Sequence, residues 1–362
     1  MTTPIHIHNF VNLPPQSIII DVRSPIEYLQ AYIVDAVNVP LFTNDERAAV
    51  GTKYKQQGKQ AAIKIGLDYY GVKMRKIVEE VEQIIEAKKT EFLNNNNGTS
   101  TTESTDTVTL YLHCARGGMR SAAMAWLLGL YGYKVAVLVG GYKAYRNWVL
   151  AQFEKDYTLT ILGGYTGTGK THLLQQPYKA FTVIDLEALA NHRGSAFGHI
   201  GMPVQPTQEM FENKLAKAFY HTNSNNTSTN ILLEDESRRI GTCMLPNNIY
   251  NQMRRAKVYF VEKNFAERLK NIMVDYGTLP TIALQESIVK ISKRLGGLET
   301  KNALLHLENN DLQSCFGILL HYYDKYYHKG LLGRNTPPSD IIKLTEAEFI
   351  SIGSAATITP TN

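Results

Sequence analysis

Cysteine is scarce in this sequence, and no pattern uses it structurally. The 362 residues include three cysteines, Cys114, Cys243 and Cys315, which lie far apart and form no CxxC pair. Structural zinc sites and disulfide frameworks use closely spaced cysteines, so the sequence argues against both. We therefore expect a protein of a reducing compartment, and assign it to the cytoplasm.

Signals for secretion or membrane insertion are also missing. The first residues, MTTPIHIHNFVNLPPQ, have neither a basic nor a long apolar region, so we expect no signal peptide. Glycines and Lys134 interrupt the longest apolar stretch, Ala122–Tyr142, which predicts a short helix, a turn and a strand rather than a membrane span. The net charge of +5 permits a polyanionic partner without requiring one.

The length and the pattern of apolar residues predict two α/β domains. Typical domains hold roughly 150 residues, so 362 residues suggest two. Val/Ile/Leu-rich runs alternate with helical patterns in both halves, which favours parallel sheets covered by helices: SIIIDV, TLYLHC and KVAVLVGG, then LTILGG, FTVIDL, NILLED and AKVYFVE. We place the boundary near Phe153–Tyr157, giving domains 1–153 and 157–362. After Phe265 we expect mainly helices, including Leu284–Leu295 and Leu312–His328.

Two segments lack apolar residues altogether. Asn94–Thr107 follows an amphipathic helix predicted at Lys73–Phe92, and His221–Asn230 is similar in composition. We interpret both as surface insertions without a functional role.

A strand–loop–helix segment contains the first candidate site. The strand Thr109–His113 leads into the loop CARGGMR and a helix from Ser121. Converging backbone N–H groups and the positive helix end would stabilise a thiolate at Cys114. The alternative is a buried structural cysteine. Two arginines and two glycines would complete an oxyanion cradle around it: Arg116, Arg120, Gly117 and Gly118.

The second half begins with a phosphate-binding motif. Residues 164–171, GYTGTGKT, satisfy G-x4-G-K-[ST] between a predicted strand and a predicted helix. The loop would wrap a phosphate with its N–H groups, Lys170 would supply charge, and Thr171 could reach a Mg²⁺ ion. The motif leaves open whether ATP or another di- or triphosphate binds. Its glycines are Gly164, Gly167 and Gly169.

Polar residues at the ends of other predicted strands are further candidates. Asp235 is the first candidate for the Mg²⁺ side of the loop and Asp185 the second, although either could simply begin a helix. The glycine-flanked segment with His192, Arg193 and Ser195 suits substrate contact. Arg238 and Arg239 could contact RNA phosphates, or could lie on a solvated helix face.

Three segments of the first half resemble the rhodanese family. These are Ile18–Pro40, the loop at Cys114, and Leu138–Trp148. The resemblance implies that Cys114 carries sulfur as a persulfide, and that Asp21 and Arg23 support the fold. Arg120 stands six positions after the cysteine instead of five. His-Cys-x5-Arg-Ser is also the signature of cysteine-dependent phosphatases, so a chalcogen carrier and a phosphatase both remain open.

Taken together, the motifs of both halves resemble the tRNA 2-selenouridine synthase family. CARGGMRS, GGYTGTGKT, DLEALANHRGSAFG, LLEDESRRIG and the segment Asn44–Gly66 carry the resemblance, which weakens after about Phe265. It implies replacement of sulfur by selenium in the 2-thiouridine of a tRNA anticodon loop. The co-substrates would be selenophosphate, from a supplying enzyme, and geranyl diphosphate. Cys114 would carry selenium or hold an intermediate.

The alternatives are an ATP-dependent tRNA sulfurtransferase, a rhodanese-fold phosphatase fused to a nucleotide-binding domain, and an RNA-binding protein with an inert cysteine.

Overall fold

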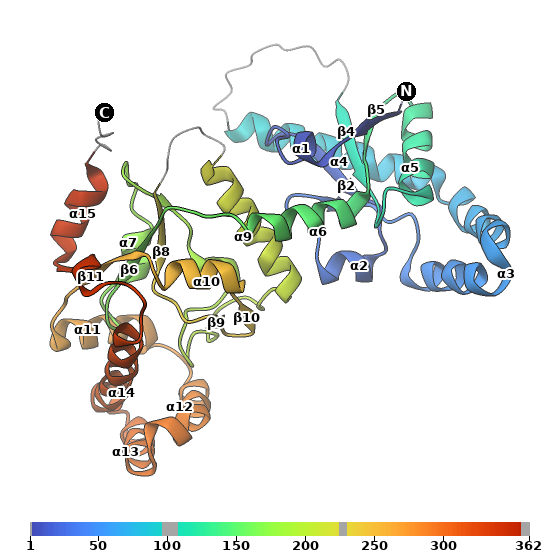
Figure 1. Ribbon diagram of the computed structural model, residues 1–362. Helices are drawn as coiled ribbons and strands as arrows, with labels where there is room; N and C mark the ends of the chain where they lie inside the picture. Colours follow the sequence, from blue (N-terminus) through green and yellow to red (C-terminus); the bar gives the residue numbers. More distant parts are fainter. Residues whose placement is uncertain (1, 96–107, 224–229, 356–362) are drawn as a thin grey trace, which may run out of the picture. The chain divides into compact units, whose positions relative to one another are not determined.

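A computed structural model describes residues 2–95, 108–223 and 230–355 (Figure 1). The chain divides between residues 151 and 152 into two compact units, which we describe separately. Each unit is built on a five-stranded parallel sheet with helices, so the predicted α/β class is confirmed. Within the described ranges, no helix is long and apolar enough to cross a membrane.

The sheet of the first unit has the strand order β1-β5-β4-β2-β3. Its central strands, β2 (Ile18–Asp21), β4 (Thr109–His113) and β5 (Lys134–Leu138), are the three predicted apolar runs. They bury Ile20, Leu110 and Leu112 completely. The sequence analysis missed both edge strands, β1 (Thr2–Ile5) and β3 (Val37–Asn38), because the first is mostly exposed and the second has only two residues.

Six helices accompany this sheet within the described part of the first unit. The segment Asn44–Gly66, which carries part of the family resemblance, lies in α3, where Gly58 breaks the helix with a φ of 82°. Asn94 and Asn95 belong to α4, whereas the rest of the first proposed insertion, 96–107, lies outside the described residues. The bounds are α1 Ile7–Phe10, α2 Pro25–Gln30, α3 Asn44–Gly71, α4 Met74–Asn95, α5 Met119–Leu130 and α6 Gly141–Gln152.

The second unit has the strand order β12-β11-β6-β8-β7. The phosphate motif follows its central strand, β6 (Leu159–Gly163), which is buried along its whole length. The other strands are β7 Thr182–Val183, β8 Ile231–Glu234, β11 Lys257–Val261 and β12 Ile341–Leu344, and β9 (Arg239–Ile240) pairs with β10 (Cys243–Met244) in a small hairpin. The helices before β11 are α7 Lys170–Leu174, α8 Leu186–Ala190, α9 Gln208–Asn223 and α10 Asn247–Met253.

The predicted helical C-terminal part is confirmed, with one addition. Four helices follow β11 and share an apolar core that includes Ile272, Ile288 and Phe316. The chain then returns to the sheet as β12, a strand that was not predicted, and continues into α15. The bounds are α11 Phe265–Tyr276, α12 Thr281–Leu295, α13 Gly297–Glu308, α14 Leu312–Leu332 and α15 Glu346–Ser354.

The second proposed insertion, His221–Asn230, is wrong at its start. His221 to Asn223 form the last turn of α9, and the hydroxyl group of the buried Thr222 donates to the carbonyl of Phe219. Because this hydrogen bond satisfies the hydroxyl group within the helix, the polar Thr222 can belong to the last helical turn instead of a surface loop. Residues 224–229 lie outside the described residues.

Candidate functional site

Cys114 lies at the carboxyl end of β4, where the cysteine loop begins. Its side chain is buried, and its Sγ atom is 3.3 Å from the backbone N of Gly118 and 3.3 Å from the Oγ of Ser121. Burial by itself would raise the pKa of the thiol. Hydrogen bonds from the Ser121 hydroxyl and from the N–H groups of Ser121, Arg116 and Gly118 outweigh burial and lower the pKa of Cys114 below its usual value.

The pKa values of the other two cysteines are shifted in the opposite direction, upward. Burial raises the pKa of Cys243, and raises the pKa of Cys315 to about 11. The thiolate is the nucleophilic form of cysteine, so Cys114 is the cysteine suited to chemistry.

A turn with Gly140 and Gly141, which follows β5, packs against the cysteine loop. The backbone N of Tyr142 donates to the carbonyl of Cys114 at 2.8 Å, and that of Lys143 donates to Ala115 at 3.0 Å. Gly117 has a φ of 64°, and a Cβ atom there would lie 2.9 Å from the backbone N of Gly140. The loop can therefore keep its path only because glycines meet at this contact.

The two arginines of the cysteine loop have different surroundings. Arg116 is exposed. Arg120 donates to Glu27 at 2.7 Å and 3.3 Å, so a carboxylate from α2 already faces its guanidinium group. Burial would raise the pKa of Glu27, but hydrogen bonds and charge from Arg120, with hydrogen bonds from Ser24, lower it to about 2. An incoming oxyanion would share Arg120 with Glu27, a partner that sequence reasoning missed.

A buried ion pair lies behind the cysteine strand. Arg23 donates to both carboxylate oxygens of Asp21 and to the carbonyl of Ala31, and its guanidinium group lies 3.8 Å from the ring centre of Tyr142. His113 is fully buried beside Asp21, and burial lowers its pKa to about 4. The pair joins β2 to neighbouring segments, which is the fold-supporting arrangement that the rhodanese resemblance implies for Asp21 and Arg23.

The phosphate loop connects β6 to α7 in the second unit. Gly164, Gly167 and Gly169 all have positive φ values, and a Cβ at Gly167 would lie 2.6 Å from the carbonyl of Arg268. The Nζ of Lys170 donates to the carbonyl of Gly164 at 2.7 Å, so its ammonium group is held over the loop. Thr171 is exposed at the first turn of α7.

Helices α11 and α14 fix the phosphate loop from outside. The buried Arg268 donates to the carbonyl of Thr166 and forms a two-pronged ion pair with Asp324 at 2.7 Å and 2.6 Å. Asn271 donates to the carbonyl of Gly167 at 2.8 Å. The motif alone could not reveal these supports, because they come from about 100 to 160 residues further along the chain.

The predicted carboxylates differ in their contacts. Asp235 accepts a hydrogen bond from Tyr327 at 2.7 Å and pairs with Arg334, while Tyr327 also accepts the N–H of Gly164. Asp185 accepts the N–H of Ala188 and begins α8, the alternative that the sequence analysis left open. Among the described residues, no group of three or more His, Cys, Asp or Glu side chains could hold a metal ion. The Mg²⁺ expected with Thr171 stays a prediction.

A glutamate cluster interacts with Lys170, and sequence reasoning did not single it out. Burial raises the pKa of Glu187 to about 7, aided by the charge of Asp185 and opposed by that of Lys170. Burial and the neighbouring carboxylates also raise the pKa values of Glu234 and Glu236. A carboxyl group that titrates near neutrality is suited to acid–base chemistry. The quoted segments DLEALANHRGSAFG and LLEDESRRIG contain all three glutamates.

The remaining predicted contact residues divide between buried and exposed positions. His192 is buried, and burial lowers its pKa. Arg193 is exposed, and its charge partly opposes the rise in the pKa of Glu187 that burial causes. Arg238 and Arg239 are exposed before and in the β9–β10 hairpin, with Arg239 donating to the carbonyl of Gly241.

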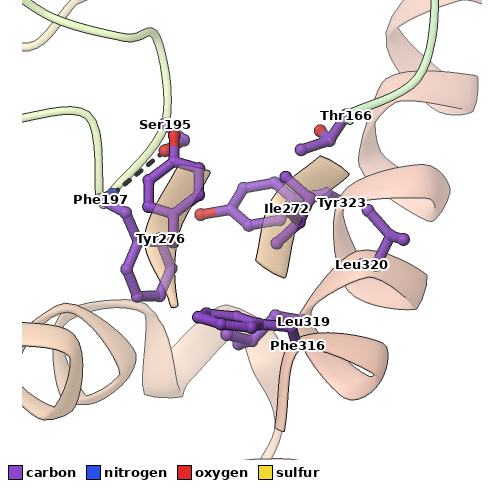
Figure 2. A pocket seen from close by; sticks show the side chains of 9 residues that line it. All are labelled: Thr166, Ser195, Phe197, Ile272, Tyr276, Phe316, Leu319, Leu320 and Tyr323. Atoms are coloured by element: carbon purple, nitrogen blue, oxygen red, sulfur yellow. Dashed lines mark hydrogen bonds between the residues drawn. The ribbon is translucent and has the colours of Figure 1, made fainter. Parts of the chain in front are cut away.

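An apolar pocket adjoins the phosphate loop (Figure 2). Thr166 of the loop and Ser195 are its polar lining residues, and the rest of its wall is apolar or aromatic. The free space is about 30 Å³. The lining side chains come from the phosphate loop, the segment after α8, α11 and α14: Thr166, Ser195, Phe197, Ile272, Tyr276, Phe316, Leu319, Leu320 and Tyr323.

The fold and the two loops define a class of protein: a rhodanese-like domain followed by a P-loop domain. Residues 8–147 match the family described as rhodanese-like domain, and residues 157–339 match the tRNA 2-selenouridine synthase AAA domain. The second match continues through α14, beyond the point near Phe265 where the resemblance weakened.

Proteins named tRNA 2-selenouridine synthase match most of the chain. The one from Nitrosomonas eutropha is 31% identical over 88% of this chain and 90% of its own length. Those from Shewanella denitrificans and Bdellovibrio bacteriovorus are each 35% identical, over 85% and 83% of this chain and 87% and 82% of their own lengths. The chain belongs to the tRNA 2-selenouridine synthase family.

Proposed function

We propose that this protein replaces the sulfur of 2-thiouridine in tRNA by selenium, in two half-reactions. In the first, the thiocarbonyl sulfur attacks the allylic carbon of geranyl diphosphate, a C–S bond forms and diphosphate leaves. The uridine N3 proton is lost as C2 becomes an S-alkyl centre. In the second, selenophosphate gives its selenium to C2, geranylthiol departs and phosphate is released after water cleaves the Se–P bond. No external oxidant or reductant is required.

One observation carries the first half-reaction: a residue of the phosphate loop also lines an apolar pocket. Thr166 belongs to the loop, where Lys170 provides positive charge, and it also lines the space bounded by Ile272 and Leu320. A site with a diphosphate end and an apolar end suits an ester of diphosphate with an apolar alcohol. The cavity is smaller than an isoprenyl chain, so binding requires side chains such as Leu320 and Tyr323 to turn aside.

Charge at the loop favours departure of diphosphate. Negative charge develops on the leaving oxygen, and the N–H groups of the loop with Lys170 would stabilise it without reorganisation. Glu187 is our candidate base for the uridine N3 proton, because its pKa is raised to about 7 and its charge interacts with Lys170. Both groups belong to the second unit, so the proposal for this step needs no residue of the first.

The second half-reaction would use the cysteine loop. The lowered pKa of Cys114 favours a thiolate, which would displace geranylthiol from C2 of the S-geranylated uridine and then leave as selenophosphate attacks C2. Arg116 and Arg120 carry the charge that an oxyanion such as selenophosphate requires.

Mass spectrometry of nucleosides tests the proposal. The protein is incubated with 2-thiolated tRNA, geranyl diphosphate and selenophosphate, singly and together, and the wobble nucleoside is analysed. We expect S-geranylated nucleoside with geranyl diphosphate alone and 2-selenouridine with both co-substrates. An absolute requirement for ATP in either half-reaction would overturn the proposal and favour a nucleotide-dependent sulfurtransferase. Hydrolysis of an aryl phosphate through Cys114, without tRNA products, would favour a phosphatase.

A further inference from the structure

A second cavity lies in the helical part of the second unit, apart from the residues discussed so far. It has a volume of about 440 Å³, far larger than the apolar pocket. We call it the α12–α14 cleft, because those three helices supply its lining: Arg294, Leu295, Glu299, Ile318, His321, Tyr322, Lys325, Tyr326 and Lys329.

Positive charge dominates the cleft. Arg294, Lys325 and Lys329 are exposed cations, against which Glu299 is the one lining carboxylate. The structure pairs none of these three cations with a carboxylate among the residues it describes. Arg294 instead interacts with the hydroxyl group of Tyr322. Among the described residues, the cleft therefore holds cationic groups that form no ion pair, as a site for a polyanion would.

Aromatic rings accompany the cations. The rings of Tyr322 and Tyr326 lie 4.7 Å apart, and Tyr326 is 45% exposed. An exposed aromatic face between cations is the arrangement by which proteins stack an unpaired base while binding the neighbouring phosphates. A purely ionic protein partner would make no use of the ring.

Helix α14 connects the cleft to the phosphate loop. Tyr323, Asp324 and Tyr327 face the loop and its supports, whereas Tyr322, Tyr326 and Lys329 line the cleft. These two sets lie on opposite sides of one helix, whose diameter with side chains is about 10–12 Å. A strand of RNA in the cleft would therefore lie within a few nucleotides of the loop.

We propose that the α12–α14 cleft binds single-stranded RNA flanking the nucleotide to be modified. Lys325, Lys329 and Arg294 bind the phosphates, and Tyr326 stacks on an unpaired base. The inference rests on the proposed function for its choice of RNA, but it adds a binding surface in the region to which the sequence analysis gave no chemistry.

Binding of a fluorescent RNA stem-loop to the full chain tests the inference. Anisotropy is measured over a series of salt concentrations with wild type, the double variant Lys325→Gln/Lys329→Gln, and the control Lys270→Gln/Lys301→Gln. The control removes two exposed lysines that do not line the cleft. We expect the cleft variant to bind at least about 5-fold more weakly. Its salt dependence should fall by about 1.4 in the log–log slope, because each phosphate contact to single-stranded RNA contributes about 0.7. The control should bind like wild type.

Variants at Tyr326 separate stacking from charge. Tyr326→Ala should weaken binding about 5- to 150-fold, as expected for loss of a stacked base, and leave the salt slope unchanged. Tyr326→Phe should bind RNA as tightly as wild type, because the phenyl ring can still stack on a base. Circular dichroism verifies that each variant is folded.

Several outcomes would overturn the inference. One is equal binding by the cleft variant and the control, and another is an unaffected Tyr326→Ala variant. A nucleoside monophosphate that binds as tightly as the stem-loop would show a small-anion site instead. RNA binding that depends on the cleft, without any seleno- or geranyl product, would contradict only the proposed function. Wild-type product formation with an unchanged KM for tRNA in the Lys325→Gln/Lys329→Gln variant would contradict only the inference.

Discussion

The backbone of Gly141 lies directly against the carbonyl of Cys114. A Cβ atom at Gly141 would be 2.3 Å from that oxygen, and the residue has a φ of 57°. Cys114 is thus positioned by a glycine that follows it by 27 residues and has no functional group.

Gly141→Ala should therefore displace the cysteine loop. We expect a loss of about 1–3 kcal/mol in the free energy of unfolding, and a thiol pKa that returns toward its usual value. Gly129→Ala is the matched control, because no atom lies within 4 Å of its Cβ position and the residue is helical. Both tryptophans, Trp126 and Trp148, belong to the first unit, so their fluorescence reports its unfolding. Equal stability of the two variants would contradict the assigned contact.

Cys114 should be the thiol with the lowest pKa in the chain. The ultraviolet absorbance of the thiolate, titrated in wild type and Cys114→Ala, should differ by one group with a pKa below that of a free cysteine. Cys114→Ala should also abolish selenium incorporation while tRNA still binds. Cys315→Ser is the control, since burial raises the pKa of that thiol to about 11 and no functional loop contains it. Selenation at the wild-type rate by Cys114→Ala would remove the role we propose.

Lys170→Ala should suppress S-geranylation about 30- to 1,000-fold, because a charge-assisted contact to a leaving phosphate contributes roughly 2–4 kcal/mol in the transition state. The conversion of ready-made S-geranylated tRNA to the seleno product should persist. Lys343→Ala, which removes an exposed lysine paired with Glu262, should change neither step. Normal geranylation with selenation alone lost would instead place the selenium donor in the phosphate loop.

Geranylation should increase with pH as Glu187 loses its proton. Burial raises the pKa of this carboxyl group to about 7, so the basic form is minor at pH 6 and dominant at pH 8. Glu187→Gln should lower the rate and remove this increase from the pH profile. The conversion of S-geranylated tRNA needs no such base and serves as the internal control. An unaltered pH profile in Glu187→Gln would exclude Glu187 as the base.

Acid should weaken the contribution of Glu27 to stability. Burial would raise the pKa of Glu27, but Arg120 dominates and lowers it from 4.5 to about 2. A lowered carboxyl pKa stabilises the folded state above the unfolded value, and this stabilisation is lost as pH falls through the folded value. We expect Glu27→Gln to cost about 1–2 kcal/mol at pH 7, a difference that shrinks between pH 4.5 and about 2.

Tryptophan-detected unfolding measures this effect for the first unit. Glu79→Gln breaks an exposed pair with Arg75 and should cost little at any pH, because exposed ion pairs contribute little to stability. A difference between wild type and Glu27→Gln that does not depend on pH would show that charge is not the cause.

Features that depend on neighbouring residues could be predicted from the sequence. The central strands are continuous apolar runs, and the two loops are short motifs in which glycines stand within a few positions of cations, and in one loop also of a cysteine. Backbone path and local charge depend on such neighbours, so the α/β class and both loops could be predicted. The edge strands β1, β3 and β12 could not, because their pairing depends on a sheet already in place.

The residues that surround each loop, in contrast, depend on how distant segments pack together. Glu27 reaches Arg120 from 93 positions away, and Tyr327 reaches Gly164 from 163 positions away. Such pairs form because strand order and helix packing bring distant segments together, and no local pattern encodes that order. The same holds for the two sides of α14. Tyr322 and Tyr323 are adjacent in sequence, but Tyr322 lines the α12–α14 cleft and Tyr323 lines the apolar pocket beside the phosphate loop. Successive residues of an α-helix point in different directions around its axis, so neighbouring tyrosines have different surroundings. Packing of the helix determines which side faces the loop.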